Sequence, residues 1–286
     1  MKPVFGLGAL TVLTLYSMCG ALAVAGTPAT TAGMAKQGPY RTIVEAASGA
    51  PGLKVFRPES LDRFPRRDTL PVVVWGNGGC LYDTPVYASF LQTLASYGFL
   101  VITTAAPPGK PAPSREVTVA DLEAAVNWAK QENARSGSPL RGKIDATRVA
   151  AMGQSCGGSL AIGLGGGPHV STVGVFDYGT PDGDALRGLH EPVLLIAGGE
   201  MDFMRMSAKV NFDAIDKLPV FYGSLHGAGH EGTVMEPGGG EFANIAASWA
   251  LWQLKGDKKA SRMFVGAECG LCAKPNWDTQ SKRLAK

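Results

Sequence analysis

Residues 153–157 read Gly-Gln-Ser-Cys-Gly, so the pattern G-x-S-x-G has Ser155 at its centre. An apolar run at residues 149–152 precedes this segment, and Gly158 and Ser159 follow it. This order predicts a strand, a tight turn and a helix. A serine at such a turn exposes its hydroxyl, and the flanking glycines let neighbouring backbone approach closely. The predicted chemistry of Ser155 is nucleophilic attack beside a helix N-terminus that can receive negative charge.

A nucleophilic serine requires a base, together with an acid that orients the base. For a serine at this type of turn, the chain order is serine, acid, histidine. We expect the acid directly after the apolar run at 193–197, where Asp202 is the first choice and Glu200 the nearest rival. Asp177, after the preceding apolar run, is a less favoured alternative. The competing role for Asp202 is to cap the next helix.

The base is expected among the four histidines of the chain. Only His226 and His230 follow the last predicted strand, in the segment Leu-His-Gly-Ala-Gly-His-Glu-Gly at 225–232. Its glycines favour a flexible turn that can reach the serine. His230 is nearer the closing helix and is the predicted base, and His226 is predicted to be a loop or substrate-side residue.

Two backbone N–H groups are expected to bind the oxyanion of an attacked carbonyl. One belongs to Cys156, the residue after the nucleophile. The other belongs to the loop Gly-Asn-Gly-Gly-Cys at residues 76–80, which follows a buried apolar run. Gly79 is the first choice of donor in this loop, with Gly78 and Cys80 as alternatives.

Apolar runs typical of buried strands alternate along the chain with segments of helical periodicity. Strands that alternate with helices indicate an α/β fold with a mostly parallel sheet covered on both faces. The pattern contains no internal repeat and no second domain. Strands are predicted at 53–57 (an outer strand), 70–75, 99–103, 145–152, 173–176, 193–197 and 220–222 (the last), with helices around 87–97, 119–126 and 242–252.

The stretch between the apolar runs at 173–176 and 193–197 contains no long insertion. We therefore expect an open site without a lid, which accepts short or surface-presented acyl groups. Trp75 and Tyr82 are candidates to border this site as substrate-binding residues, although Trp75 fits the core equally well.

The N-terminus predicts export from the cell. Lys2 precedes an apolar stretch over residues 4–24, which ends in the small-residue signal Ala-Val-Ala at 23–25. This pattern indicates a secretory signal peptide over 1–25 rather than a membrane anchor. A flexible leader over 26–40 and a single domain over 41–286 follow, and about 260 residues suffice to bury a large α/β core.

Charge and motif content limit the partners that we expect. The formal net charge is +3, and no Lys/Arg cluster is long enough to indicate nucleic-acid binding. The predicted serine chemistry needs no metal and no cofactor. We expect a secreted monomer, extracellular or periplasmic, whose partner is an ester substrate.

The cysteines suggest disulfides, because four remain after Cys19 leaves with the signal peptide. Cys269 and Cys272 form a C-x-x-C segment that is predicted to close a local structural bridge. Cys80 lies on one predicted oxyanion segment and Cys156 on the other. These segments meet in this architecture, so we predict a Cys80–Cys156 disulfide.

The chain resembles secreted α/β-hydrolases of the branch that contains dienelactone-hydrolase-like proteins, chlorophyllase-like proteins and polyester hydrolases of the cutinase type. The resemblance covers nearly all of the mature chain. It implies an α/β-hydrolase fold, with a mostly parallel central sheet flanked by helices and no large cap domain. It rests on residues 75–80, 153–158, 192–202 and 227–230, with a similar cysteine-bearing segment at 264–272.

The chain departs from the polyester hydrolases at two places. Those enzymes usually have histidine before the nucleophile and methionine after it, where this chain has Gln154 and Cys156. They often have an aromatic residue in the oxyanion loop, where this chain has Gly79 and Cys80. We expect a serine carboxylic-ester hydrolase for short-chain esters, acetylated polysaccharide or polyester. An acyltransferase with the same triad, or a non-catalytic binding protein of this fold, are the alternatives.

Overall fold

The computed structural model describes residue 1 and residues 35–83, 85–267 and 269–284. These residues form a nine-stranded sheet in the order β1-β2-β4-β3-β5-β6-β7-β8-β9. Strands β3 to β8 are mutually parallel, whereas β1, β2 and β9 run antiparallel to their neighbours. The strands are β1 (Thr42–Ala47), β2 (Ala50–Pro58), β3 (Leu70–Gly76), β4 (Leu100–Thr104), β5 (Ile144–Gln154), β6 (Thr172–Phe176), β7 (Val193–Ala197), β8 (Val220–Leu225) and β9 (Trp277–Lys282).

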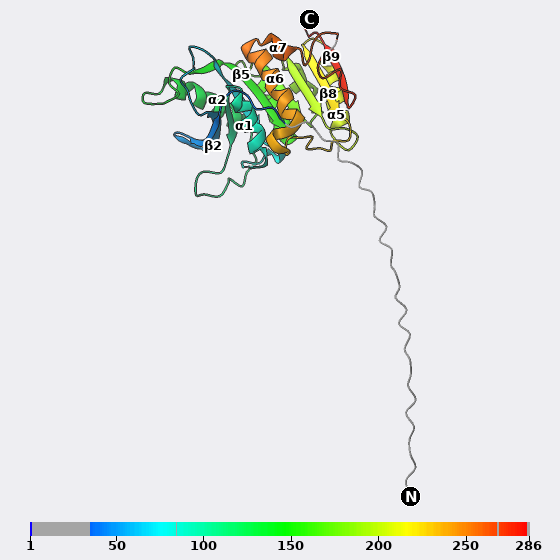
Figure 1. Cartoon of the computed structure of the whole chain (residues 1–286), viewed down its shortest axis with the longest axis horizontal. Coiled ribbons are helices and arrows are strands. Elements are labelled where there is room, and N and C mark those ends of the chain that lie inside the picture. Colours follow the sequence, from blue (N-terminus) through cyan, green and yellow to red (C-terminus); the bar gives the residue numbers. More distant parts are fainter. Residues whose placement is uncertain (2–34, 84, 268, 285–286) are drawn as a thin grey trace. The chain divides into compact units, whose positions relative to one another are not determined.

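Helices cover both faces of this sheet (Figure 1). Side chains of a single strand are buried on both faces of the sheet. Val72 and Val74 of β3 belong to one apolar cluster, and Val73 belongs to the other. Burial on both faces explains why the central strands are continuous apolar runs. α1 (Ala88–Ser96) and α6 (Gly240–Lys255) pack together on one face, α2 (Val119–Ala134), α3 (Cys156–Gly165) and α5 (Arg205–Ala214) cover the other, and α4 (Gly183–Arg187) and α7 (Lys258–Ser261) are short.

The predicted α/β architecture is confirmed, and every predicted strand and helix has a counterpart. The segment between β6 and β7 holds the five-residue helix α4, which leaves no room for a large cap. Two predictions about the edges are wrong. β1 pairs outside β2, so residues 53–57 are not an outer strand, and β9 follows β8, so residues 220–222 are not the last strand. β9 escapes detection because an exposed edge strand needs no apolar run: it reads Trp-Asp-Thr-Gln-Ser-Lys.

The predicted signal peptide, apart from residue 1, lies outside the described residues, as does most of the predicted leader. The last part of that leader is not loose. The Lys36 N–H donates to Asn244 Oδ1 at 2.7 Å, and the Gly38 N–H donates to Ser96 Oγ at 2.7 Å. Residues 35–40 are therefore part of the domain, attached to α1 and α6. Across the described residues, no helix has the length and apolar character needed to span a membrane.

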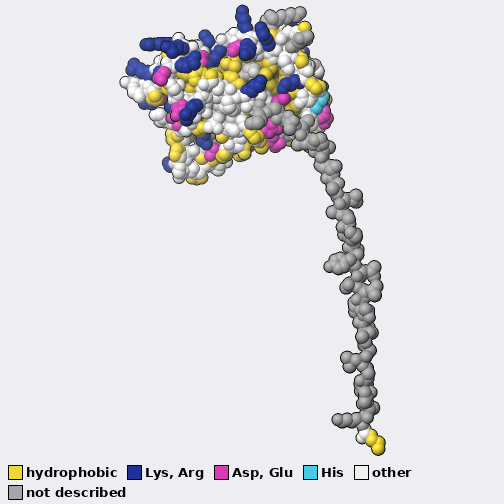
Figure 2. Space-filling model, viewed as in Figure 1, with side chains coloured by type: hydrophobic (Ala, Val, Ile, Leu, Met, Phe, Trp, Pro, Cys, Tyr) yellow, Lys and Arg dark blue, Asp and Glu magenta, His cyan; other side chains and the backbone are white. Residues whose placement is uncertain are grey.

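Charge is unevenly distributed on the surface although the formal net charge is only +3. Figure 2 shows Lys and Arg side chains gathered along the edge of the domain where α7 lies in Figure 1. Lys258 and Lys259 of α7 are exposed. An uneven distribution of this kind is not visible in the linear sequence, which has no long basic run.

Candidate active site

Ser155 lies at a strained turn between β5 and α3. Its backbone has φ +52° and ψ −125°, a conformation that costs a residue with a side chain roughly 1–3 kcal/mol. The strain is retained because glycines pack backbone against backbone around it. A Cβ added to Gly157 would collide with the carbonyl of Gly76 at the end of β3, and one added to Gly153 would collide with the Gly157 carbonyl. The turn therefore places Ser155 between the end of β5 and the start of α3, where its side chain is partly exposed.

His230 lies between Ser155 and Asp202. Its Nε2 is 2.8 Å from Ser155 Oγ, and its Nδ1 is 2.8 Å from Asp202 Oδ1. The Asp202 side chain is fully buried and that of His230 is 16% exposed. Asp202 Oδ1 also accepts the Met204 N–H just before α5, but Met204 and not Asp202 is the N-cap of that helix. The three residues chosen from chain order thus meet in hydrogen-bonding geometry.

The other acidic and histidine candidates lie apart from the His230 ring. Glu200 is exposed, and its carboxylate accepts the Gly227 N–H at 3.1 Å. His226 pairs with Asp278 of β9, with 3.0 Å between Nε2 and Oδ1. His226 is thus tied to the edge strand that the sequence does not reveal. Its pairing with a carboxylate gives no support to a substrate contact.

Asp177 follows β6 and is completely buried. Its Oδ1 lies 2.9 Å from the Gly198 nitrogen, and Asp202 Oδ2 lies 3.1 Å from the same nitrogen. Two carboxyl groups therefore share one N–H donor. Burial, reinforced by the nearby Asp202 carboxylate, raises the pKa of Asp177 well above its ordinary value. Sequence patterns give no signal for this pair, because it depends on two adjacent strands ending side by side.

The loop at residues 76–80, which we call the oxyanion loop, lies against the N-terminus of α3. The Gly78 N–H donates to the Tyr87 hydroxyl at 3.2 Å, so this alternative donor is already engaged. Gly79 has φ +63°, which glycine adopts without steric cost. Cys80 and Cys156 form a disulfide with a Cα–Cα distance of 5.2 Å, and Cys269–Cys272 is the second bridge; both pairings match the prediction.

The two aromatic candidates do not border the triad. Trp75 is completely buried and packs against Tyr87, Phe90 and Phe176, so its prediction as a substrate contact is wrong and the core interpretation is right. Tyr82 is only 7% exposed, and its hydroxyl donates to Asp121 of α2. Both side chains are buried in the apolar core.

Phe203 is an aromatic residue at the triad that the sequence patterns do not predict. Its ring lies 4.0 Å from the His230 ring, measured between centroids, with the planes inclined by 33°. Phe203 and Met201 are both 73% exposed. Leu81, which follows the oxyanion loop, is 55% exposed. Apolar side chains thus stand exposed on two of the loops that form the site.

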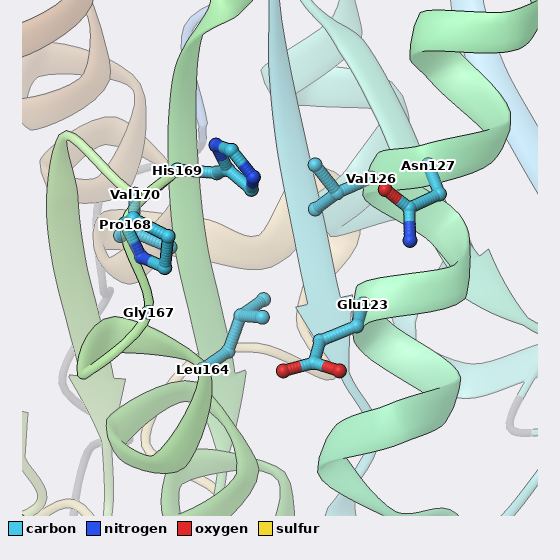
Figure 3. A pocket seen from close by; sticks show the side chains of 8 residues that line it. All are labelled: Glu123, Val126, Asn127, Leu164, Gly167, Pro168, His169 and Val170. Carbon is cyan, nitrogen blue, oxygen red and sulfur yellow. The ribbon is translucent and has the colours of Figure 1, made fainter.

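A separate pocket lies between α2 and the loop after α3 (Figure 3). It has a volume of about 270 Å³, and Glu123 and Asn127 of α2 line one side of it while His169 lies across from them. None of the triad residues lines it. This pocket and Ser155 therefore belong to different parts of the domain.

The two disulfides close chain segments of different length, which predicts that they contribute differently to the free energy of unfolding. Cys80–Cys156 spans 76 residues and Cys269–Cys272 spans three. A long closed loop restricts the unfolded chain more. Replacing Cys80 and Cys156 together by alanine should lower the free energy of unfolding by about 2–4 kcal/mol. Urea denaturation measures this, and the paired Cys269→Ala/Cys272→Ala variant, as matched control, should lose less. An equal or larger loss in the control would contradict the prediction.

Asp177 predicts a pH-dependent change in stability. Its folded-state pKa is raised, so its stabilising contribution is present below its unfolded pKa of about 4 and is lost as pH rises above that value. Asp177→Asn replaces this carboxyl group by an amide that cannot ionise. The free energy of unfolding of the variant relative to wild type should therefore increase from pH 4 to pH 8. Urea denaturation at several pH values tests this, with exposed Asp62→Asn as control. A relative stability that stays constant with pH would count against it.

Comparison with known proteins accords with this fold. The model of the PET hydrolase-like family matches residues 24–269, which is most of the chain. A search of curated proteins found no match. The matched region contains the oxyanion loop, Ser155, Asp202 and His230. The chain therefore belongs to the PET hydrolase-like family of ester hydrolases with the α/β-hydrolase fold.

Proposed function

We propose that this protein is a secreted serine ester hydrolase that works through an acyl-enzyme. The observation that carries the proposal is the His230 ring, which lies 2.8 Å from Ser155 Oγ on one side and 2.8 Å from Asp202 Oδ1 on the other. Membership in a family of ester hydrolases supports the reaction class. Two disulfides and the predicted signal peptide support secretion, because disulfides persist in oxidising compartments.

In the proposed mechanism, Ser155 Oγ attacks the ester carbonyl while His230 Nε2 takes its proton. Asp202 holds the Nδ1–H tautomer and stabilises the imidazolium that forms. His230 then gives the proton to the departing alcohol. Water, activated by the same imidazole, attacks the acyl-enzyme and releases the acid. The first proton transfer uses the contact between Ser155 Oγ and His230 Nε2, which are already within hydrogen-bonding distance in the resting protein.

The oxyanion would be bound by the N–H groups of Cys156 and Gly79. Cys156 begins α3, where the helix dipole also favours negative charge. Gly79 is favoured over Gly78, whose N–H is donated to Tyr87. One such donor contributes about 3 kcal/mol to transition-state stabilisation. The disulfide between Cys80 and Cys156 links the two segments that supply these donors.

The proposed substrates are short-chain esters and ester groups exposed on polymers, polyester foremost. The segment between β6 and β7 is too short to cover the triad with a cap. Met201, Phe203 and Leu81 expose apolar surface on the surrounding loops. An open site with apolar borders suits an ester that cannot enter a deep pocket. Family membership favours polyester over acetylated polysaccharide, which is more polar.

Substitution of the triad tests the catalytic assignment. Ser155→Ala should lower kcat/KM for p-nitrophenyl acetate by on the order of 10⁴- to 10⁶-fold. Asp202→Asn should lower it by roughly 10⁴-fold, because the histidine loses its orienting carboxylate. Glu200→Gln should cost far less and serves as matched control. If Glu200→Gln proves the more damaging change, Asp202 is not the triad acid.

Product analysis and labelling separate hydrolysis from its alternatives. The free acid should be the main product with or without added alcohol, whereas an acyltransferase would form a new ester when alcohol is present. A fluorophosphonate should label wild type and leave Ser155→Ala unlabelled. A wild-type protein that takes no label would indicate a non-catalytic member of the family.

The exposed apolar side chains predict a difference between polymeric and soluble substrates. Met201→Ser should lower the rate at which soluble hydrolysis products leave polyester particles several-fold more than the rate on p-nitrophenyl acetate, because only the extended substrate covers the loop surface. The exposed Val44→Ser on β1 is the matched control. Parallel assays of both substrates measure the ratio. A ratio unchanged by Met201→Ser would show that this surface does not contact the polymer.

A further inference from the structure

Gln154 is the residue before the nucleophile, and its side chain is 2% exposed. It ends β5 and is buried, whereas its neighbour Ser155 is partly exposed. A buried side-chain amide has one acceptor and two donor hydrogens, and leaving them unpaired is costly. The partners of this amide therefore show what the site uses it for.

The acceptor end of Gln154 reaches the oxyanion loop through one hydroxyl. The Tyr87 hydroxyl donates to Gln154 Oε1 at 2.8 Å and accepts the Gly78 N–H at 3.2 Å. Burial raises the pKa of Tyr87 to about 12, so the hydroxyl keeps its proton at neutral pH. A Cβ on Gly78 would lie 2.6 Å from Gln154 Oε1. The oxyanion loop thus lies directly against this pair.

The donor end of Gln154 reaches the loop that carries the base. Its Nε2 donates to the backbone carbonyl of His230 at 2.9 Å and lies 3.4 Å from Asp177 Oδ2. Asp177 in turn accepts the Gly198 N–H that Asp202 also contacts. The Gln154 amide therefore contacts the His230 backbone directly and, through Asp177, the Gly198 N–H that Asp202 also contacts.

We propose that Gln154 is a positioning residue, which fixes the oxyanion loop and the His230 backbone relative to Ser155. The chain Gly78–Tyr87–Gln154–His230 joins the oxyanion loop to the backbone of the base through three hydrogen bonds. Such a chain acts on the rate because catalytic groups displaced by about 1 Å can lose about 100-fold. This inference deepens, and rests on, the serine ester hydrolase function proposed above.

The test uses two variants that remove hydrogen bonds with little change of volume, Gln154→Met and Tyr87→Phe. Each should lower kcat for p-nitrophenyl acetate by about 10- to 100-fold and leave KM within about twofold. Because both variants break the same chain, the double variant should lose little more than the worse single variant. Losses that multiply would indicate independent sites and would overturn the proposed chain.

Matched controls separate positioning from loss of stability. Asn211 is another buried amide, which donates to the Thr180 carbonyl and accepts its N–H, both at 2.7 Å. The Tyr40 hydroxyl donates to Asp68 Oδ2 at 2.7 Å. Asn211→Leu and Tyr40→Phe, which lose side-chain hydrogen bonds away from the triad, should lower stability but leave kcat within about twofold. If the controls lose kcat as much as Gln154→Met, the effect is general destabilisation and the proposal fails.

Hydrogen exchange gives a readout that needs no substrate. Backbone amides of residues 76–80 and 226–232 should exchange faster in both chain variants than in wild type, and no faster in Asn211→Leu. If Gln154→Met does not fold, Tyr87→Phe alone decides, and unchanged kcat and exchange there overturn the inference. An active wild type with unaffected chain variants refutes only the positioning role. A wild-type protein without esterase activity refutes the proposed function. In that case the hydrogen-exchange rates of residues 76–80 and 226–232 alone test whether the hydrogen-bonded chain fixes these loops.

Discussion

The structure depends on a close backbone contact among β3, β5 and α3 around Ser155. A Cβ at Gly76, Gly153 or Gly157 would collide with the backbone of another of these segments, so the three lie as close as main chains can. This contact retains Ser155 at φ +52°. It also brings the end of β3 to the N-terminus of α3, where the Cys80–Cys156 bridge forms. The same backbone contact therefore accounts both for the strained conformation of Ser155 and for the closeness of residues 76–80 to α3.

The parallel sheet then brings the acid and the base to that contact. Loops that follow adjacent parallel strands emerge at the same edge, so Asp177 after β6 and Asp202 after β7 reach one N–H, that of Gly198. Their surroundings differ. Asp202 contacts the His230 ring, whereas Asp177 has its pKa raised by complete burial and by the Asp202 charge. Two carboxyl groups that contact one N–H therefore have different further partners, the His230 ring for Asp202 and the Gln154 amide for Asp177.

Sequence patterns predict those parts of the molecule that local chemistry determines. β7 matches its predicted range of 193–197, because burial on both faces requires a continuous apolar run. The serine–acid–histidine order likewise follows from strand order. Contacts that are set by three-dimensional packing are not predictable in this way. The side chain of Trp75 is buried in the core rather than at the site. The edge strand β9, whose Asp278 pairs with His226, is polar and shows no apolar periodicity.

The segment between β6 and β7 is too short for a large cap, and this explains why the site needs its connections. An enzyme that closes a lid can assemble its catalytic groups on closure and exclude water at that moment. A site left open must hold its donors in place beforehand, because reorganisation during the reaction would cost rate. The disulfide ties the oxyanion loop to α3 covalently, and the buried chain through Gln154 ties the same loop to the His230 backbone. The two connections approach Ser155 from opposite neighbours in the sequence, Gln154 and Cys156, so both variable positions of G-x-S-x-G help to fix the groups around the serine.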